Sequence, residues 1–141
     1  MKRAFLIIVL SLLSMLSGAQ EKAVSASYML IGKQIYTDHC TTCHQVDGVG
    51  AQNMIPPLVK TDYVLGDKAT IIKIVLNGMK GEMKINGDMY SNEMPAQASL
   101  KDNEIAAVLT YIRNSFGNKA DAVTIDEVKK VRASNKAPEK K

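Results

Sequence analysis

The sequence predicts a small all-α domain. Three segments carry apolar residues at the spacing of an amphipathic helix, and two of them end at glycine-asparagine pairs that stop helices. The stretches between these segments are rich in glycine and proline, as loops are. With 141 residues, the chain has the length of one domain, and no internal repeat is visible.

The three predicted helices cover 28–39, 68–76 and 101–116. We expect the second helix to end at Asn77-Gly78. We expect the third to begin behind Ser99 as its N-cap and to end at Gly117-Asn118. Between them, 79–93 alternates short polar and apolar stretches around two glycines, which predicts a loop or a hairpin.

The N-terminus has the three-part layout of a secretory signal peptide. A basic start, Met1-Lys2-Arg3, precedes the apolar run 4–16, and small residues up to Ala19 supply a cleavage site. The run is shorter than the ~20 apolar residues of a membrane-spanning helix, although an uncleaved anchor remains the alternative. We therefore expect 1–19 to be a signal peptide, 20–27 a linker, and the mature protein to be periplasmic, with membrane association only if the leader is uncleaved.

The net charge of +4 comes from the two ends of the chain. Residues 20–128 contain 10 basic and 13 acidic side chains, whereas six basic residues lie in 129–141. No segment interleaves basic and aromatic residues, so the charge does not predict nucleic-acid binding. We expect 133–141 to be a solvated Lys-rich tail, with docking to an anionic partner as the alternative.

The chemistry of the chain is concentrated in Cys40-Thr41-Thr42-Cys43-His44. A disulfide here would close a tiny loop, a thioredoxin-like pair would lie in a βαβ unit, and a zinc site would need two further ligands. The remaining interpretation is covalent haem attachment, which C-x-x-C-H indicates. Thiols three positions apart on a helical turn can form two thioethers with one haem c, and His44 then ligates the iron.

From about Tyr28 to Arg132, the chain resembles the class I monohaem cytochrome c family. The matching stretches are the C-x-x-C-H segment, Pro56-Pro57-Leu58, Met94-Pro95 and 102–113, in the family's order. The resemblance implies a domain over 28–132 in which an N-terminal and a C-terminal helix pack crosswise around the haem, with a methionine on the distal side.

The resemblance also implies roles for single residues. Met94 is the expected distal ligand because it precedes Pro95 in the family's context, with Met83 and Met89 as the alternatives. Pro56 and Leu58 match the family's Pro-x-Leu, in which the proline carbonyl accepts the proximal imidazole N–H; a plain loop proline is the alternative.

Other matches concern the fold and not the chemistry. Gly32 and Tyr36 on the first helix are expected to meet Val108 and Tyr111 on the last. His39 is expected to face solvent, with bis-His ligation as the alternative. Two positions depart from the family's pattern: Gln45 replaces a frequent glycine, and Phe116 replaces a frequent tryptophan.

The function that follows is electron transfer by a one-electron carrier that is not an enzyme. Its expected partners are redox proteins, a dehydrogenase, an oxidase or another reductase, and the protein is expected to be a monomer or a subunit of a complex. The alternatives are a dedicated electron-transfer subunit of a periplasmic dehydrogenase or oxidase, and a haem enzyme or sensor with an open distal site.

Overall fold

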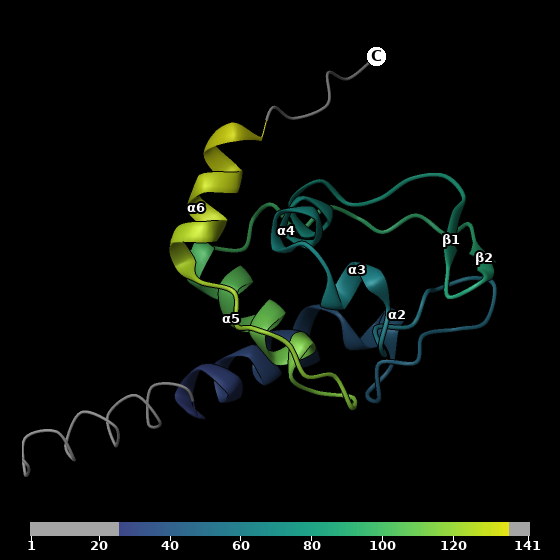
Figure 1. Cartoon of the computed structure of the whole chain (residues 1–141), viewed down its shortest axis with the longest axis horizontal. Helices are drawn as coiled ribbons and strands as arrows, with labels where there is room; N and C mark the ends of the chain where they lie inside the picture. Colours follow the sequence, from purple (N-terminus) through teal and green to yellow (C-terminus); the bar gives the residue numbers. More distant parts are fainter. Residues whose placement is uncertain (1–25, 136–141) are drawn as a thin grey trace, which may run out of the picture.

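The computed structural model describes residues 26–135. The chain is mostly helical, with one small two-stranded sheet, so the predicted all-α class is confirmed. Its elements are a first helix over 26–39, α2 (Thr41–His44), α3 (Asp62–Leu65), α4 (Lys68–Asn77), β1 (Met83–Ile85), β2 (Asp88–Tyr90), α5 (Asp102–Arg113) and α6 (Ile125–Ser134) (Figure 1). The predicted signal peptide 1–19, most of the linker and 136–141 lie outside the described residues.

The ends of α4 follow the sequence, whereas the start of α5 does not. The Asp67 carboxylate accepts the Thr70 N–H at 2.8 Å, and α4 ends at Gly78, as expected. The N-cap of α5 is Lys101, so the prediction of Ser99 was wrong. The reason is Glu104, whose carboxylate accepts the Lys101 N–H at 2.7 Å and starts the helix there, while Ser99 lies in the preceding turn.

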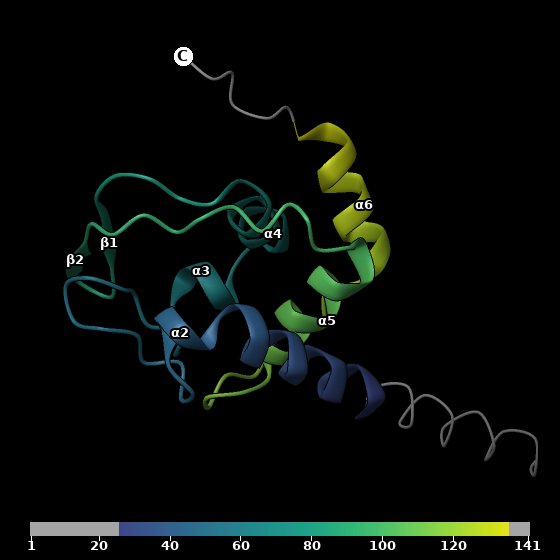
Figure 2. The same ribbon diagram turned by 180° about the vertical axis from the view of Figure 1, so that it is seen from behind.

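The first helix crosses α5 at close range, as the sequence predicts (Figure 2). A Cβ atom on Gly32 would overlap the Ala107 carbonyl oxygen and stand 2.7 Å from Cβ of Tyr111, so only glycine fits this crossing. Tyr36 packs beside it on Tyr111 and Phe116, with ring centroids 5.6 Å and 5.2 Å away. The crossing therefore fixes the helix that leads into the two cysteines.

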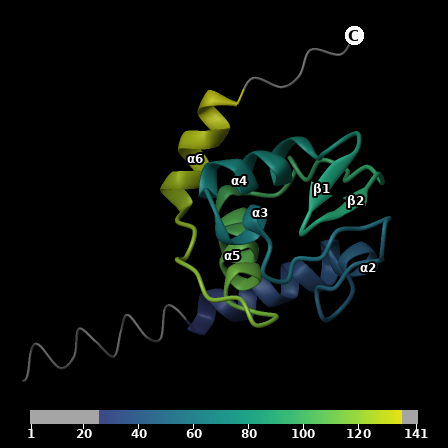
Figure 3. The same ribbon diagram turned by 45° about the vertical axis from the view of Figure 1, so that its right-hand side comes forward.

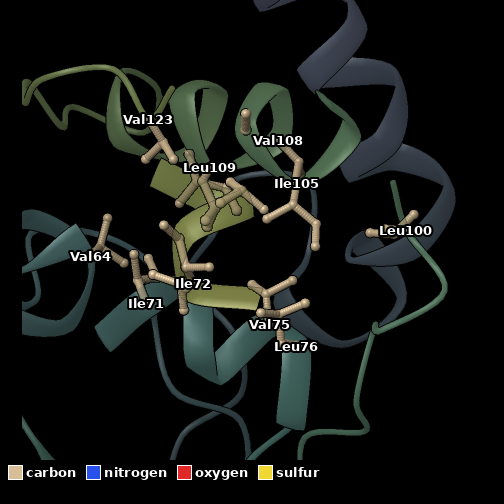
Figure 4. Close-up of a cluster of buried hydrophobic side chains, with 14 of the residues drawn as sticks. Val64, Ile71, Ile72, Val75, Leu76, Leu100, Ile105, Val108, Leu109 and Val123 are labelled. Carbon is tan, nitrogen blue, oxygen red and sulfur yellow. The ribbon is translucent and has the colours of Figure 1, made fainter. Parts of the chain in front are cut away.

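The main core lies between α4 and α5 (Figure 4). Ile72 on α4 and Ile105 on α5 are fully buried, and Leu109 lies against them. Burying each such side chain contributes about 1.5–3 kcal/mol. Arg113, also buried, donates to the carbonyl oxygens of Val64, Gly66 and Asp121, which ties α5 to α3. This core supports one side of the cavity described below.

The hairpin β1–β2 lies on the opposite side of the molecule from α6 (Figure 3). Met83 pairs with Tyr90 and Ile85 with Asp88, which confirms the looped or hairpin segment expected over 79–93. Asn86 and Gly87 form its turn with φ values of 52° and 99°, the left-handed region that such two-residue turns need. The hairpin carries a second, small apolar cluster of Met83, Ile85 and Tyr90.

The helix α6 was not predicted from the sequence. It begins at the N-cap Thr124, whose hydroxyl accepts the Glu127 N–H, and its Val128 and Val131 are buried against α4 and α5. The helix continues to Ser134, two residues beyond the expected domain boundary. The helix therefore includes Ala133 and Ser134, the first two residues of the expected tail, both of which are exposed.

Candidate cofactor site

The first helix and α2 place three chemical groups at one cavity. The amides of Cys43 and His44 both donate to the Cys40 carbonyl, at 3.2 Å and 2.9 Å, which closes the turn of α2. The Thr41 hydroxyl donates to the Tyr36 carbonyl at 3.0 Å and joins this turn to the first helix. Both cysteines and His44 consequently line the same cavity.

His44 is oriented by the loop that follows it. Its side chain is 9% exposed, and its Nδ1 lies 3.1 Å from the Pro56 carbonyl oxygen, the contact that the sequence predicts. A carbonyl can only accept, so Nδ1 carries the hydrogen and Nε2 keeps its lone pair. Burial lowers the pKa of His44, and the hydrogen bond to Pro56 only partly opposes this. The side chain therefore offers a neutral nitrogen, the form that ligates metals.

The cysteines do not have the properties of a redox pair. Burial and, as a smaller effect, the nearby Cys43 raise the pKa of the Cys40 thiol to about 11. Reactive thiols have a lowered pKa. Cys43 is exposed. Within 26–135, no group of three or more Cys, His, Asp or Glu side chains is placed to hold a metal ion. His39, the other histidine, is exposed and lies away from the cavity lining.

The cavity opens partly to solvent, and its lining is almost wholly apolar. A mostly apolar lining with a few well-placed polar groups is typical of pockets that hold small molecules and cofactors. Its proximal wall is formed by Cys40, Cys43, His44, Pro56 and Leu58, and its distal wall by Met79, Met83, Met94 and Leu100. All six predicted site residues, Cys40, Cys43, His44, Pro56, Leu58 and Met94, therefore lie around one space.

The methionines divide into two groups. Of the six methionines within 26–135, Met79, Met83 and Met94 line the cavity, whereas Met29, Met54 and Met89 do not. Met94 is held through its backbone, because its N–H and carbonyl exchange two 2.9 Å hydrogen bonds with Met79. Gly78 lies so close that a Cβ atom there would overlap the Met94 carbonyl oxygen.

Asn118 is a structural residue of the site that sequence reasoning missed. Its side-chain nitrogen donates to the carbonyls of Leu58 and Ile112, and its oxygen accepts the Lys60 N–H, each at 2.8 Å. It thereby fastens the proximal wall to α5 across about 60 residues of sequence. The Gly117-Asn118 pair was interpreted only as a helix stop, and its sequence gave no signal of this bridge.

These features fit one kind of cofactor. A flat apolar group suits the apolar lining, two thiols on one helical turn can attach it, and a neutral imidazole with a free nitrogen can ligate its iron. The site thus defines a helical protein that binds haem covalently.

Comparisons with known proteins identify the family. The sequence model of the family described as Cytochrome c matches residues 30–116. Cytochrome c-552 from Thermus thermophilus is 35% identical over 117 residues, which cover 77% of this chain and 88% of that protein. The chain belongs to the cytochrome c family, as a class I monohaem cytochrome c with one covalent haem c.

Two further relatives are parts of larger enzymes. The cytochrome c subunit of a quinone-dependent alcohol dehydrogenase from Gluconobacter oxydans is 30% identical over 105 residues, which cover 73% of this chain and 22% of that protein. The CcoP subunit of a cbb3-type cytochrome c oxidase from Azospirillum is 34% identical over 110 residues, which cover 70% and 32%. The relatives therefore show that this chain is an electron-transfer cytochrome c, either a carrier or a cytochrome subunit.

Proposed function

We propose that this protein is a periplasmic one-electron carrier whose haem iron is ligated by His44 and Met94, and that it moves electrons between redox enzymes. The haem supplies one-electron exchange between ferrous and ferric iron. The observation that carries the proposal is that one apolar cavity holds both attachment thiols, the neutral imidazole and the backbone-anchored Met94.

The proximal residues support this role by orienting a strong ligand. The Pro56 carbonyl accepts the Nδ1–H of His44, which fixes the ring and increases its basicity. On the distal wall, the thioether of Met94 is a soft ligand that raises the reduction potential of haem iron. The chain's part in electron transfer is then to hold both ligands in place and to keep water out of an apolar cavity.

The rival function is a haem enzyme or sensor with an open distal site. Two protein ligands leave the iron no free position, so we expect the reduced protein to bind carbon monoxide slowly or not at all at neutral pH. Stopped-flow mixing with carbon monoxide measures this directly. Rapid and complete binding would contradict the carrier.

A second candidate is a dedicated subunit of one oxidoreductase, favoured by the dehydrogenase and oxidase subunits among the relatives. Gel filtration of a native extract followed by haem staining distinguishes a free carrier from such a subunit. A carrier elutes at the size of the free chain, whereas a subunit elutes with its enzyme.

Export is the remaining part of the proposal. The expected signal peptide lies outside the described residues, and none of the helices within 26–135 is long and apolar enough to cross a membrane. Mass spectrometry of the protein from a periplasmic fraction tests the export. We expect a mature chain that begins at Gln20 and carries one haem, and finding the full-length chain would contradict cleavage.

A further inference from the structure

The segment from 94 to 101, here called the distal loop, joins Met94 to α5. On one side it rests on the end of α4: Met94 pairs with Met79, and the Gln97 N–H donates to the Val75 carbonyl at 2.8 Å. Its Leu100 is buried and lines the cavity together with Met94. The position of the distal loop therefore decides where the Met94 side chain enters the cavity.

Arg132 of α6 holds the other end of this loop. Its Nη1 donates to the Ala98 carbonyl at 3.0 Å and its Nη2 to the Leu100 carbonyl at 2.6 Å. Its Nε donates to the Asp102 carboxylate at 2.7 Å, at the first residue of α5. A planar guanidinium can donate to several acceptors at once and loses little conformational entropy per hydrogen bond. A lysine ammonium cannot replace it in this role.

The helix α6, which carries Arg132, is itself held in place by α4. Next to it Val131 is buried, and Val128 is fully buried one turn earlier. The ends of α6 are joined to α4 by the Lys68–Glu127 ion pair at 3.0 Å and by two amide hydrogen bonds between Asn77 and Asn135. The same helix, α4, thus anchors the distal loop directly and holds the helix that carries Arg132.

We propose that Arg132 is a positioning residue for Met94. This inference rests on the proposed ligation by Met94. An outside ligand can replace Met94 only if the distal loop moves away from the cavity, and the three contacts of Arg132 oppose that movement. Arg132 consequently stabilises the closed, Met94-ligated state relative to an open one.

The test compares ligand exchange in three holoproteins: wild type, Arg132→Met and Lys68→Met. Arg132→Met keeps the aliphatic stem but removes the guanidinium, whereas Lys68→Met removes a tie of α6 that does not touch the distal loop. Each ferric protein is titrated with imidazole while the far-red absorption band of thioether-ligated ferric haem is followed. Circular dichroism records global unfolding in parallel.

We expect the apparent dissociation constant of imidazole to fall about tenfold in Arg132→Met and to stay within about twofold of wild type in Lys68→Met. Equal constants in Arg132→Met and wild type would overturn the proposal, and so would an equal fall in both variants. Arg132→Lys, which keeps one cationic donor, covers the case that Arg132→Met does not fold; a fall of about threefold is expected, and no change overturns the proposal. A wild-type protein without the far-red band would instead contradict Met94 ligation itself.

Discussion

The two walls of the haem cavity are built in different ways. The proximal wall is made largely by neighbours in sequence: the His44 carbonyl accepts the Gly50 N–H, the Gly48 carbonyl accepts the Leu58 N–H, and the His44 ring bonds Pro56. The distal wall is made by residues far apart, because Met94 bonds Met79, and Arg132 reaches back over about 30 residues to the distal loop.

The two walls therefore have different roles. The proximal wall carries the groups that attach the haem, whereas the distal wall holds Met94. The thiols and the imidazole of the proximal wall lie on one turn and the residue that follows it, whereas Met94 is held through Met79 behind α4 and through the distal loop that Arg132 of α6 contacts. We therefore expect removal of the two thiols of the proximal wall to abolish covalent haem attachment. Changes in the distal wall should alter how firmly Met94 is held at the cavity.

The largest effect is expected from the double substitution Cys40→Ser and Cys43→Ser. Without thiols no thioether can form, so the chain should lose all covalent haem. Haem staining after denaturing electrophoresis measures this, and Thr42→Ala, an exposed position between the two cysteines, is the control that keeps full staining. Staining of the double variant would break the assignment of the attachment site.

Asn118→Ala should have the next largest effect. It leaves the Lys60 N–H and the Leu58 carbonyl without this partner and removes one donor from the Ile112 carbonyl, and unpaired buried groups of this kind cost about 1–3 kcal/mol each. We expect the free energy of unfolding to fall by about 3 kcal/mol in denaturant titrations. Lys119→Ala, at the exposed neighbouring position, should change it little, and equal effects of the two variants would refute the bridge.

Gln45→Gly should stabilise the protein. Gln45 has φ 65° and ψ 168°, a region that side chains rarely adopt, and such strain costs about 1–3 kcal/mol against about 0.5–1 kcal/mol for the extra entropy of glycine. A gain of about 1 kcal/mol in thermal or chemical unfolding is expected. Gln45→Ala keeps the Cβ atom and should give no gain; if alanine stabilises as much as glycine, backbone strain is not the cause.

The smallest expected effect is a loss of stability in acid that comes from Glu127, which joins α6 to Lys68 of α4. Burial acts to raise the pKa of Glu127, but hydrogen bonds from Thr124 and Lys68 outweigh it and leave the pKa below its usual 4.5. A lowered pKa means that Glu127 stabilises the fold above pH 4.5 and loses this contribution as the pH falls through the folded value. Wild type should be more stable than Glu127→Gln at neutral pH and equal to it in strong acid. A difference independent of pH would exclude the carboxylate as its source.

The proximal wall could be predicted from the sequence because its information is local. The C-x-x-C-H segment by itself indicates haem attachment. The contact between Pro56 and His44 is implied by the family's Pro-x-Leu motif. The resemblance to the family also implied that Gly32 on the first helix meets the last helix, and the close crossing confirms it. The roles of His44 and Met94 as iron ligands remain predictions.

The distal wall was less predictable because its determinants are single polar side chains with distant partners. The N-cap of α5 was misplaced because Glu104 competes with Ser99 for the helix start. The helix α6 was missed because its apolar residues are few and charged residues surround them. Arg132 carries no motif, and its importance follows only from the backbone groups that the fold brings to it. Asn118 is the corresponding case at the proximal wall, where its long-range hydrogen bonds also had no signal in the sequence.

The most direct test of the account is the ferric absorption spectrum of Met94→Ala beside that of Met83→Ala. Both side chains line the cavity, so each variant removes one methionine from the same lining. We predict that Met94→Ala loses the far-red band of thioether ligation and that Met83→Ala keeps it. Retention of the band in Met94→Ala, or its loss in Met83→Ala, would contradict the proposed ligand.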